Sequence, residues 1–273
     1  MAQSQTHHVA TPFGKHSPDR VHQLGENERV THNHDHGDQL FHLDSEGNEI
    51  VLTAHEEDAA ATTDPSEVPE LIARTTWTNN SSQAGQSNSR LFGTFTVPEA
   101  PANQGDRQVF VTLALQSNSN PVMILTVSLQ WGKTGAGGGR FWAVACWAAI
   151  GSQVFFSDLI QVKTGDLLEC EVYKEMRNGQ PAWNSICRIG DAGTRTGVNS
   201  DRDLNIAIPC MFEAAEGAAH SDYPRGQTPF EQLTLESDGG QLSPAWNARV
   251  YVSTCNPQLE VRDQNTVHLT YQN

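Results

Sequence analysis

From Leu91 onward the sequence is a succession of short apolar runs separated by turn residues. The run from Leu91 to Val97 alternates apolar and polar side chains and ends at Pro98, as expected of a half-buried strand. Denser runs follow over residues 108–115, 121–131, 140–149, 153–162, 166–174, 183–189, 232–236, 249–253 and 267–271. Eight or more strands at this spacing predict an all-β protein, a two-sheet antiparallel β-sandwich or jelly roll. Only residues 205–216 favour a helical turn, and Pro209 opposes a long one.

The charge balance excludes two classes of partner. The chain has 32 Asp and Glu against 17 Lys and Arg, a formal net charge of −15. A nucleic-acid binder needs a basic face, and so does a protein that adheres to anionic membranes, so we expect neither partner. No apolar run approaches the ~20 residues of a membrane helix. The N-terminus has no apolar signal segment, and the five cysteines form no CxxC pair. We therefore expect free thiols and a cytoplasmic or unconventionally exported protein.

The N-terminal quarter of the chain differs from the rest. Nine of the 11 histidines lie in the first 55 residues. Residues 1–39 are polar and lack periodicity, which predicts a flexible His-rich arm that the stability of the sandwich does not require. Residues 40–53 read as a hairpin whose apolar side chains, Ile50 among them, pack against the sandwich. Residues 54–70 read as an acidic linker, and the sandwich itself is expected over 71–273.

The arm contains the densest cluster of potential metal ligands. His32, His34 and His36 alternate along it, and Asp38 follows. On an extended backbone such a set can share one divalent metal ion. The competing interpretation is a flexible tail with no defined site. A metal-binding or self-assembling protein that forms homo-oligomers through this arm is therefore one functional hypothesis; no other cofactor is expected.

A second candidate site lies on the central strands. Strand alternation places Ser128 and Gln130 together on one face of the sheet. With the aromatic side chains of Trp142 and Trp147 from the next run, that face suits an extended polymer rich in amides or hydroxyls. The alternative is structural: the tryptophans are core residues, and Gln130 is buried and bonded to backbone groups.

The same region carries a family resemblance. The segment that begins Leu129-Gln130-Trp131-Gly132 and continues to Asp166 resembles the glutamic peptidases, or eqolisins. Matching segments upstream and downstream extend the likeness over about residues 77–237. It implies a concanavalin A-like sandwich with a polymer-binding groove on one concave face. The Leu-Gln-Trp-Gly and Gly-Gly-Gly patterns are also similar to those of uncharacterised fungal proteins, which imply no settled activity.

The resemblance also implies site residues. In these peptidases a Gln and a Glu form the catalytic pair, and Gln130 matches the Gln. The position of the acid falls on Cys210, or on Ile206 in another register, while Glu213 matches a later acidic residue. A thiol among apolar neighbours stays protonated and is a poor replacement. The expected function is therefore binding of a glycan or peptide polymer without peptidase activity. The alternative is an acid hydrolase that uses Gln130 with Glu213.

Overall fold

The computed structural model describes residues 8–33, 39–52, 71–75, 87–103, 107–214, 219–250 and 257–271. Within these ranges the chain is built of strands, with two short 3-10 turns, η1 (Pro18–Arg20) and η4 (His220–Asp222), and no α-helix. No helix in these ranges is long and apolar enough to cross a membrane. The all-β, two-sheet sandwich expected from the sequence is confirmed. The acidic linker expected over 54–70 lies outside the described residues.

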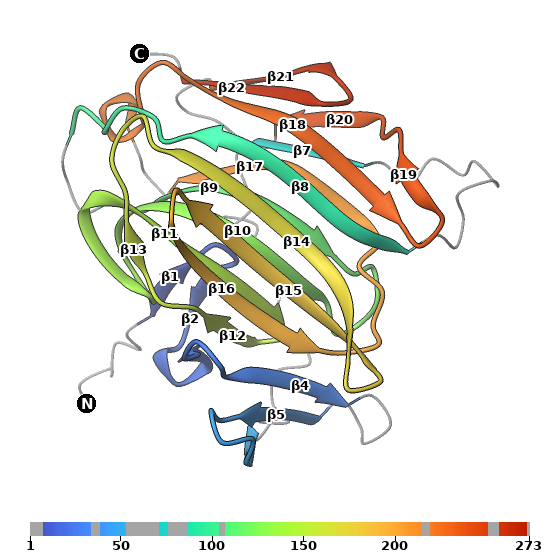
Figure 1. The fold of residues 1–273 in the computed structure, drawn as a ribbon. Helices are drawn as coiled ribbons and strands as arrows, with labels where there is room; N and C mark the ends of the chain where they lie inside the picture. Colours follow the sequence, from blue (N-terminus) through green and yellow to red (C-terminus); the bar gives the residue numbers. More distant parts are fainter. Residues whose placement is uncertain are drawn as a thin grey trace, which may run out of the picture.

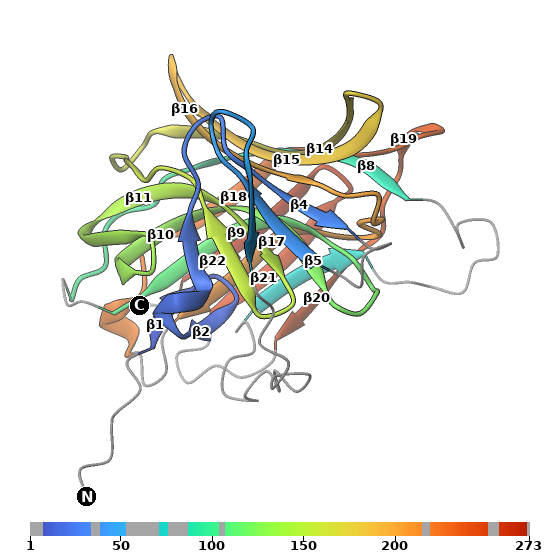
Figure 2. The same cartoon turned by 90° about the horizontal axis from the view of Figure 1, so that it is seen from below.

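One sheet has nine strands and the other has eleven, and Figure 2 shows them as two stacked layers. The nine-stranded sheet runs in the order β20 (Trp246–Val250), β7 (Leu71–Thr75), β17 (Ile206–Ala214), β9 (Val109–Gln116), β10 (Met123–Thr134), β11 (Gly137–Ile150), β12 (Gln153–Phe156) and β3 (Val21–Gln23), with β13 (Ile160–Gln161) paired to β11.

The eleven-stranded sheet forms the other layer, with β8, β14, β15 and β16 facing the reader in Figure 1. Its order is β21 (Gln258–Asp263), β22 (Thr266–Thr270), β18 (Gln227–Ser237), β8 (Asn88–Thr96), β14 (Leu167–Arg177), β15 (Gln180–Ile189), β16 (Ala192–Asn199), β4 (Arg29–Asn33), β5 (Gln39–Leu43) and β6 (Glu49–Leu52), with β19 (Gly240–Leu242) paired to β18. A separate hairpin consists of β1 (Val9–Thr11) and β2 (Gly14–His16).

The core lies between the two sheets and takes every second side chain of their long strands. On β10 the inward residues are Leu125, Val127, Leu129 and Trp131, each at most 3% exposed. The eleven-stranded sheet contributes residues such as Leu168 and Val172 of β14 and Trp183 of β15. Full burial of one such side chain contributes about 1.5–3 kcal/mol. Because alternate side chains of these strands enter the core, the side chains between them point to the outer face of each sheet.

Two segments differ from the sequence prediction. Residues 206–214 form strand β17, where a helical turn was expected, because the segment inserts between β9 and β7 and is buried there. Residues 192–199 form β16, which the sequence did not predict. This strand has few apolar residues, but it pairs residue for residue with β15, from Ala182↔Asn199 to Ile189↔Ala192.

The expectation of a flexible arm needs correction over residues 8–33. Here β3 pairs in parallel with β12 at one sheet edge, and β4 pairs in parallel with β16 at an edge of the other sheet. Between and within these strands, Leu24 and Val30 are inserted into the core with at most 1% of their surface exposed. Backbone pairing needs no apolar periodicity, and Leu24 and Val30 are too few and too irregularly spaced to produce one. The absence of periodicity was therefore misleading.

The expected hairpin is present as β5 and β6, with one change in what it buries. Leu40 pairs with Leu52, so both point to the same face, and both contact the core. Ile50, which was expected to pack inward, is 51% exposed. Asp44 closes the turn by accepting hydrogen bonds from the backbone N–H groups of Glu46 and Asn48 at 2.9 and 2.8 Å.

We predict that Leu24→Ala destabilises the protein, because it opens a cavity beneath the docked segment. The expected loss is about 2–5 kcal/mol in the free energy of unfolding, measured by urea titration. The control is Val51→Ala on the exposed side of β6, where 56% of the side chain is accessible and a change within about 0.5 kcal/mol is expected. Equal, small effects of both substitutions would show that the segment contributes nothing to the fold.

Candidate functional site

Gln130 and Glu213 lie on one cross-strand row of the nine-stranded sheet. Gln130 of β10 is directly opposite Phe110 of β9, and Phe110 is directly opposite Glu213 of β17. Directly opposed residues of antiparallel strands point to the same face. Gln130 and Glu213 are therefore on the same side of the sheet, two strand spacings or about 10 Å apart at the backbone. This is the side that faces away from the core.

An irregularity in β17 brings Glu213 to this face. The pairing of β17 with β9 shifts between Ile208 and Met211, at Pro209 and Cys210. Such a bulge moves the following side chains to the opposite face, and proline in an inner strand is typically found at one. Met211 and Glu213 therefore share the face of Gln130, while Cys210 points into the core.

Cys210 cannot replace a catalytic carboxylate. Its side chain is fully buried among apolar residues, and this burial raises the pKa of the Cys210 thiol well above its usual range. The thiol stays protonated in the folded protein and lies on the opposite side of the sheet from Gln130. The acidic residue that shares a row with Gln130 is Glu213.

The amide of Gln130 is held by the loop that joins β10 to β11. Its Nε2 donates to Thr134 Oγ1 at 2.8 Å and to the carbonyl oxygen of Gly137 at 3.4 Å. Gly132 and Gly138 have φ angles of 87° and 99°, which glycine adopts without strain, and they turn the loop back over the amide. Gln130 is 1% exposed, and its Oε1 is buried without a hydrogen-bond partner among the described residues.

Small and polar side chains surround this row. In the next row, Ser128 Oγ lies 3.0 Å from Thr112 Oγ1, and in the following row Trp147 is opposite Thr126. Trp147 is fully buried and packs against Phe156 with ring centroids 5.2 Å apart. Within the described part of the chain, its indole N–H has no hydrogen-bond acceptor. Ser128 and Trp147, two expected ligand contacts, are thus placed on the Gln130 face.

The N-terminal segment packs on the same face. Phe13 and Val21 contact the apolar cluster that contains Trp147, and the backbone N–H of Gly135 donates to the carbonyl of Ala10 at 2.8 Å. Figure 2 shows β1 and β2 below β10 and β11, on the side away from the second sheet. In the described conformation the face is closed.

Trp142 was expected to line the same face, and the structure corrects this. It lies opposite Trp131 in the pairing of β10 with β11, one residue out of phase with the Gln130 row. Both tryptophans are core residues, with ring centroids 5.3 Å apart and ring planes at 68°. Trp142 and Trp147 are five residues apart, and this odd spacing along one strand places them on opposite faces.

The metal cluster expected in the arm is only partly described. His32 is buried, and its Nδ1 lies 3.4 Å from Ser200 Oγ. His34, His36 and Asp38 lie outside the described residues. Within the ranges that the structure describes, no group of three or more His, Cys, Asp or Glu side chains is arranged to hold a metal ion. A metal site that includes the remaining residues stays a prediction.

Sequence reasoning missed Phe110, Thr134 and Met211. Phe110 separates the two polar residues of the row, Thr134 fixes the amide of Gln130, and Met211 lies opposite Thr112. Alternation along 108–115 already indicates that Phe110 points away from its neighbours Val109 and Val111. The contact of Thr134 with Gln130 depends on the curled loop, which no spacing in the sequence predicts.

The fold is similar to that of solved structures of known proteins. One match is scytalido-glutamic peptidase with a transition state analog inhibitor, at a TM-score of 0.53 and 14% identity, covering 76% of this chain and all of that chain. Another is SCP-B, a member of the eqolisin family of peptidases in a complex with the tripeptide Ala-Ile-His, at a TM-score of 0.49, 13% identity and the same coverages. The fold resembles that of the eqolisin glutamic peptidases. No protein-family model and no curated protein matches the sequence. The resemblance expected from the sequence is thus confirmed for the fold.

We predict that Cys210 does not react with a thiol reagent in the native protein. In a Cys255→Ser background, iodoacetamide at about pH 8 is expected to leave Cys146, Cys170, Cys187 and Cys210 unmodified, because all four are buried and a protonated thiol is a weak nucleophile. All four are expected to react in urea. Modification of Cys210 in the native chain, read by mass spectrometry, would contradict its placement in the core.

Proposed function

We propose that the Gln130 face binds an extended peptide and that Gln130 and Glu213 hydrolyse it. The observation that supports this is the shared row: one amide and one carboxylate on the same side of the sheet, separated by Phe110 alone. The fold is that of proteins named glutamic peptidases. The argument against activity, an acid position occupied by Cys210, loses its force because Cys210 faces the core.

The two side chains have complementary chemistry for amide hydrolysis. The Glu213 carboxylate accepts a proton from water as the water oxygen bonds to the peptide carbonyl carbon. The Nε2–H of Gln130 donates to the oxygen of that carbonyl as it becomes negatively charged. When the C–N bond breaks, the protonated Glu213 returns the proton to the leaving nitrogen. One water is consumed, and the products are a carboxylic acid and an amine.

Substrate must first open the site. The amide of Gln130 is bonded to Thr134 and Gly137, and the segment that contains Phe13 packs nearby. In this proposal, the carbonyl oxygen of the substrate replaces Thr134 and Gly137 as the acceptor of hydrogen bonds from Gln130 Nε2. The exchange is feasible because the Nε2–H groups of Gln130 have a hydrogen-bond acceptor both before and after binding.

A second candidate is a module that binds a glycan or peptide polymer without cleaving it. The observation that favours it is the use of the Gln130 amide by its own loop, which leaves no donor for an oxyanion in the described conformation. Ser128 and Trp147 would then supply a hydroxyl group and a ring for contact with the polymer. The two candidates share the face and differ in whether a bond is broken.

The test is cleavage of an unfolded protein between about pH 2 and 7, the range in which carboxyl groups serve as acid or base. We expect cleavage by the wild type and a loss of about 100-fold or more in Gln130→Ala and Glu213→Gln. Gln116→Ala, at the far end of the same face, and Glu169→Gln, on the outer side of the other sheet, are the matched controls and are expected to retain activity.

The pattern of results separates the candidates. Cleavage that survives both substitutions would reject the catalytic pair. No cleavage, together with polymer binding that Gln130→Ala weakens, would favour the binding module. Absence of both cleavage and binding on a glycan array and a peptide library would reject the Gln130 face as a functional site. A urea melt of each variant confirms that it folds.

A further inference from the structure

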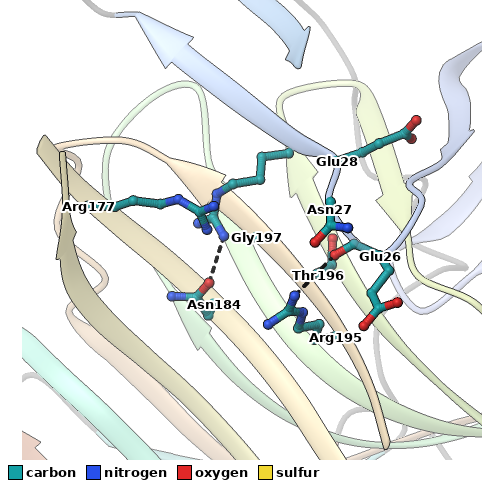
Figure 3. A pocket seen from close by; sticks show the side chains of 9 residues that line it. Glu26, Asn27, Glu28, Arg177, Asn184, Arg195, Thr196 and Gly197 are labelled. Atoms are coloured by element: carbon teal, nitrogen blue, oxygen red, sulfur yellow. Dashed lines mark hydrogen bonds between the residues drawn. The ribbon is translucent and has the colours of Figure 1, made fainter. Parts of the chain in front are cut away.

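Three arginines converge at a pocket on the outer side of the eleven-stranded sheet. The pocket lies where β4 pairs with β16, and Arg29, Arg177 and Arg195 line it together with Asn184 and Gly197. Figure 3 shows Arg177 reaching toward Asn184 from one side and Arg195 lying on the other. Its inner hollow measures about 20 Å³, enough for about one oxygen-sized atom, and it opens to solvent. The Gln130 face belongs to the nine-stranded sheet.

Arg29 is a buried cation whose described hydrogen bonds all go to neutral acceptors. It donates to Asn199 Oδ1 at 2.8 Å, to Asn184 Oδ1 at 2.9 Å and to the carbonyl of Trp183 at 3.2 Å. Its guanidinium lies against Gly197, where any side chain would collide with it. Burial and then the positive charge of Arg177 lower the pKa of Arg29 to about 10, although the nearby carboxylate of Glu175 acts in the opposite direction. The arginine therefore sits beside a like charge, and none of these three hydrogen bonds involves a carboxylate.

Asn184 presents a donor that nothing in the described structure accepts. Arg29 can only donate, so the atom of Asn184 that it contacts must be the amide oxygen, and this fixes the orientation of the amide. The Nδ2–H₂ group of Asn184 is then a donor by elimination. It is buried without a hydrogen-bond partner, and the residue as a whole is 7% exposed. A buried donor without an acceptor is costly, and a bound acceptor would remove that cost.

Two of the carboxylates near the pocket, those of Glu26 and Glu28, are directed elsewhere. Glu28 Oε2 accepts from the N–H of Gly25 at 2.8 Å and lies 3.1 Å from His42 Nε2. Arg195 donates to the backbone carbonyl of Glu26 at 3.4 Å, and in Figure 3 the side chains of Glu26 and Glu28 extend away from Asn184. The groups that converge on the hollow are therefore cationic or neutral donors, although the whole chain carries a net charge of −15.

We propose that this pocket binds a small tetrahedral oxyanion, a phosphate or sulfate group, with one oxygen on Asn184 Nδ2 and the others on Arg177 and Arg195. Arginine suits such groups because its planar donors match their oxygens in pairs. A tetrahedral anion directs its oxygens to several sides, so it can accept hydrogen bonds from donors on opposite sides of the hollow. The group is either a free ion or part of a larger molecule.

The test uses inorganic phosphate and inorganic sulfate as probes, with acetate and chloride compared at matched ionic strength. We expect phosphate or sulfate to raise the melting temperature of the wild type with a saturable dose response, because a ligand of the native state stabilises it. Isothermal titration calorimetry gives the affinity directly. Arg177→Gln, a change at the solvent-exposed rim, is expected to weaken it about tenfold or more.

Two further variants complete the design. Asn184→Asp places a carboxylate beside Arg29 and removes the free donor, so it should abolish the response to phosphate and sulfate. Arg262→Gln, which removes the same charge from the distant strand β21, should leave the affinity unchanged. A response of equal size in wild type and Arg177→Gln, no saturable response, or an equal response to acetate would each overturn the proposal. Binding of phosphate but not of a phosphorylated or sulfated sugar would identify a free ion as the ligand.

Discussion

Every second side chain on the long central strands must face the opposite sheet, and the rest of the molecule depends on this constraint. It commits Leu129, Trp131 and their counterparts to the core, and it leaves Gln130 and Ser128 to the other side. The candidate functional face is thus a consequence of core formation. One extra residue at Pro209–Cys210 then changes which side chains of β17 lie on that face. A single bulge decides whether a carboxylate or an apolar residue meets the Gln130 row.

The sequence predicted the parts of the molecule that follow from side-chain periodicity. The sandwich and the face of Gln130 come from alternation, and the hairpin around Asp44 comes from turn residues. The sequence offered Glu213 as an alternative partner of Gln130 but could not decide for it, because a bulge has no periodic signature and an alignment by sequence pattern places the acid on Cys210. Docking of residues 8–33 was missed for a related reason: backbone hydrogen bonds hold β3 and β4, and the segment adds only the apolar side chains of Leu24 and Val30 to the main core cluster.

The N-terminal segment connects the two candidate sites. Its first part packs beside Trp147 through Phe13 and Val21, and its later part supplies Glu26 to Arg29 of the arginine pocket. Between them, β3 and Leu24 attach the segment to the nine-stranded sheet and the core. A shift of this segment would therefore change both sites together.

The parallel pairing of β3 with β12 and of β4 with β16 has a consequence for behaviour in concentrated solution. Without these partners, β12 and β16 would each present a row of unpaired N–H and C=O groups at a sheet edge, a template on which strands of another molecule can add. The short N-terminal strands occupy both positions. Beyond β4, the sheet ends at β6, where Glu49 lies on the outermost strand, and a charged residue at a sheet margin discourages further strand addition. The segment therefore covers two edges of the sandwich that would otherwise be open to strand addition.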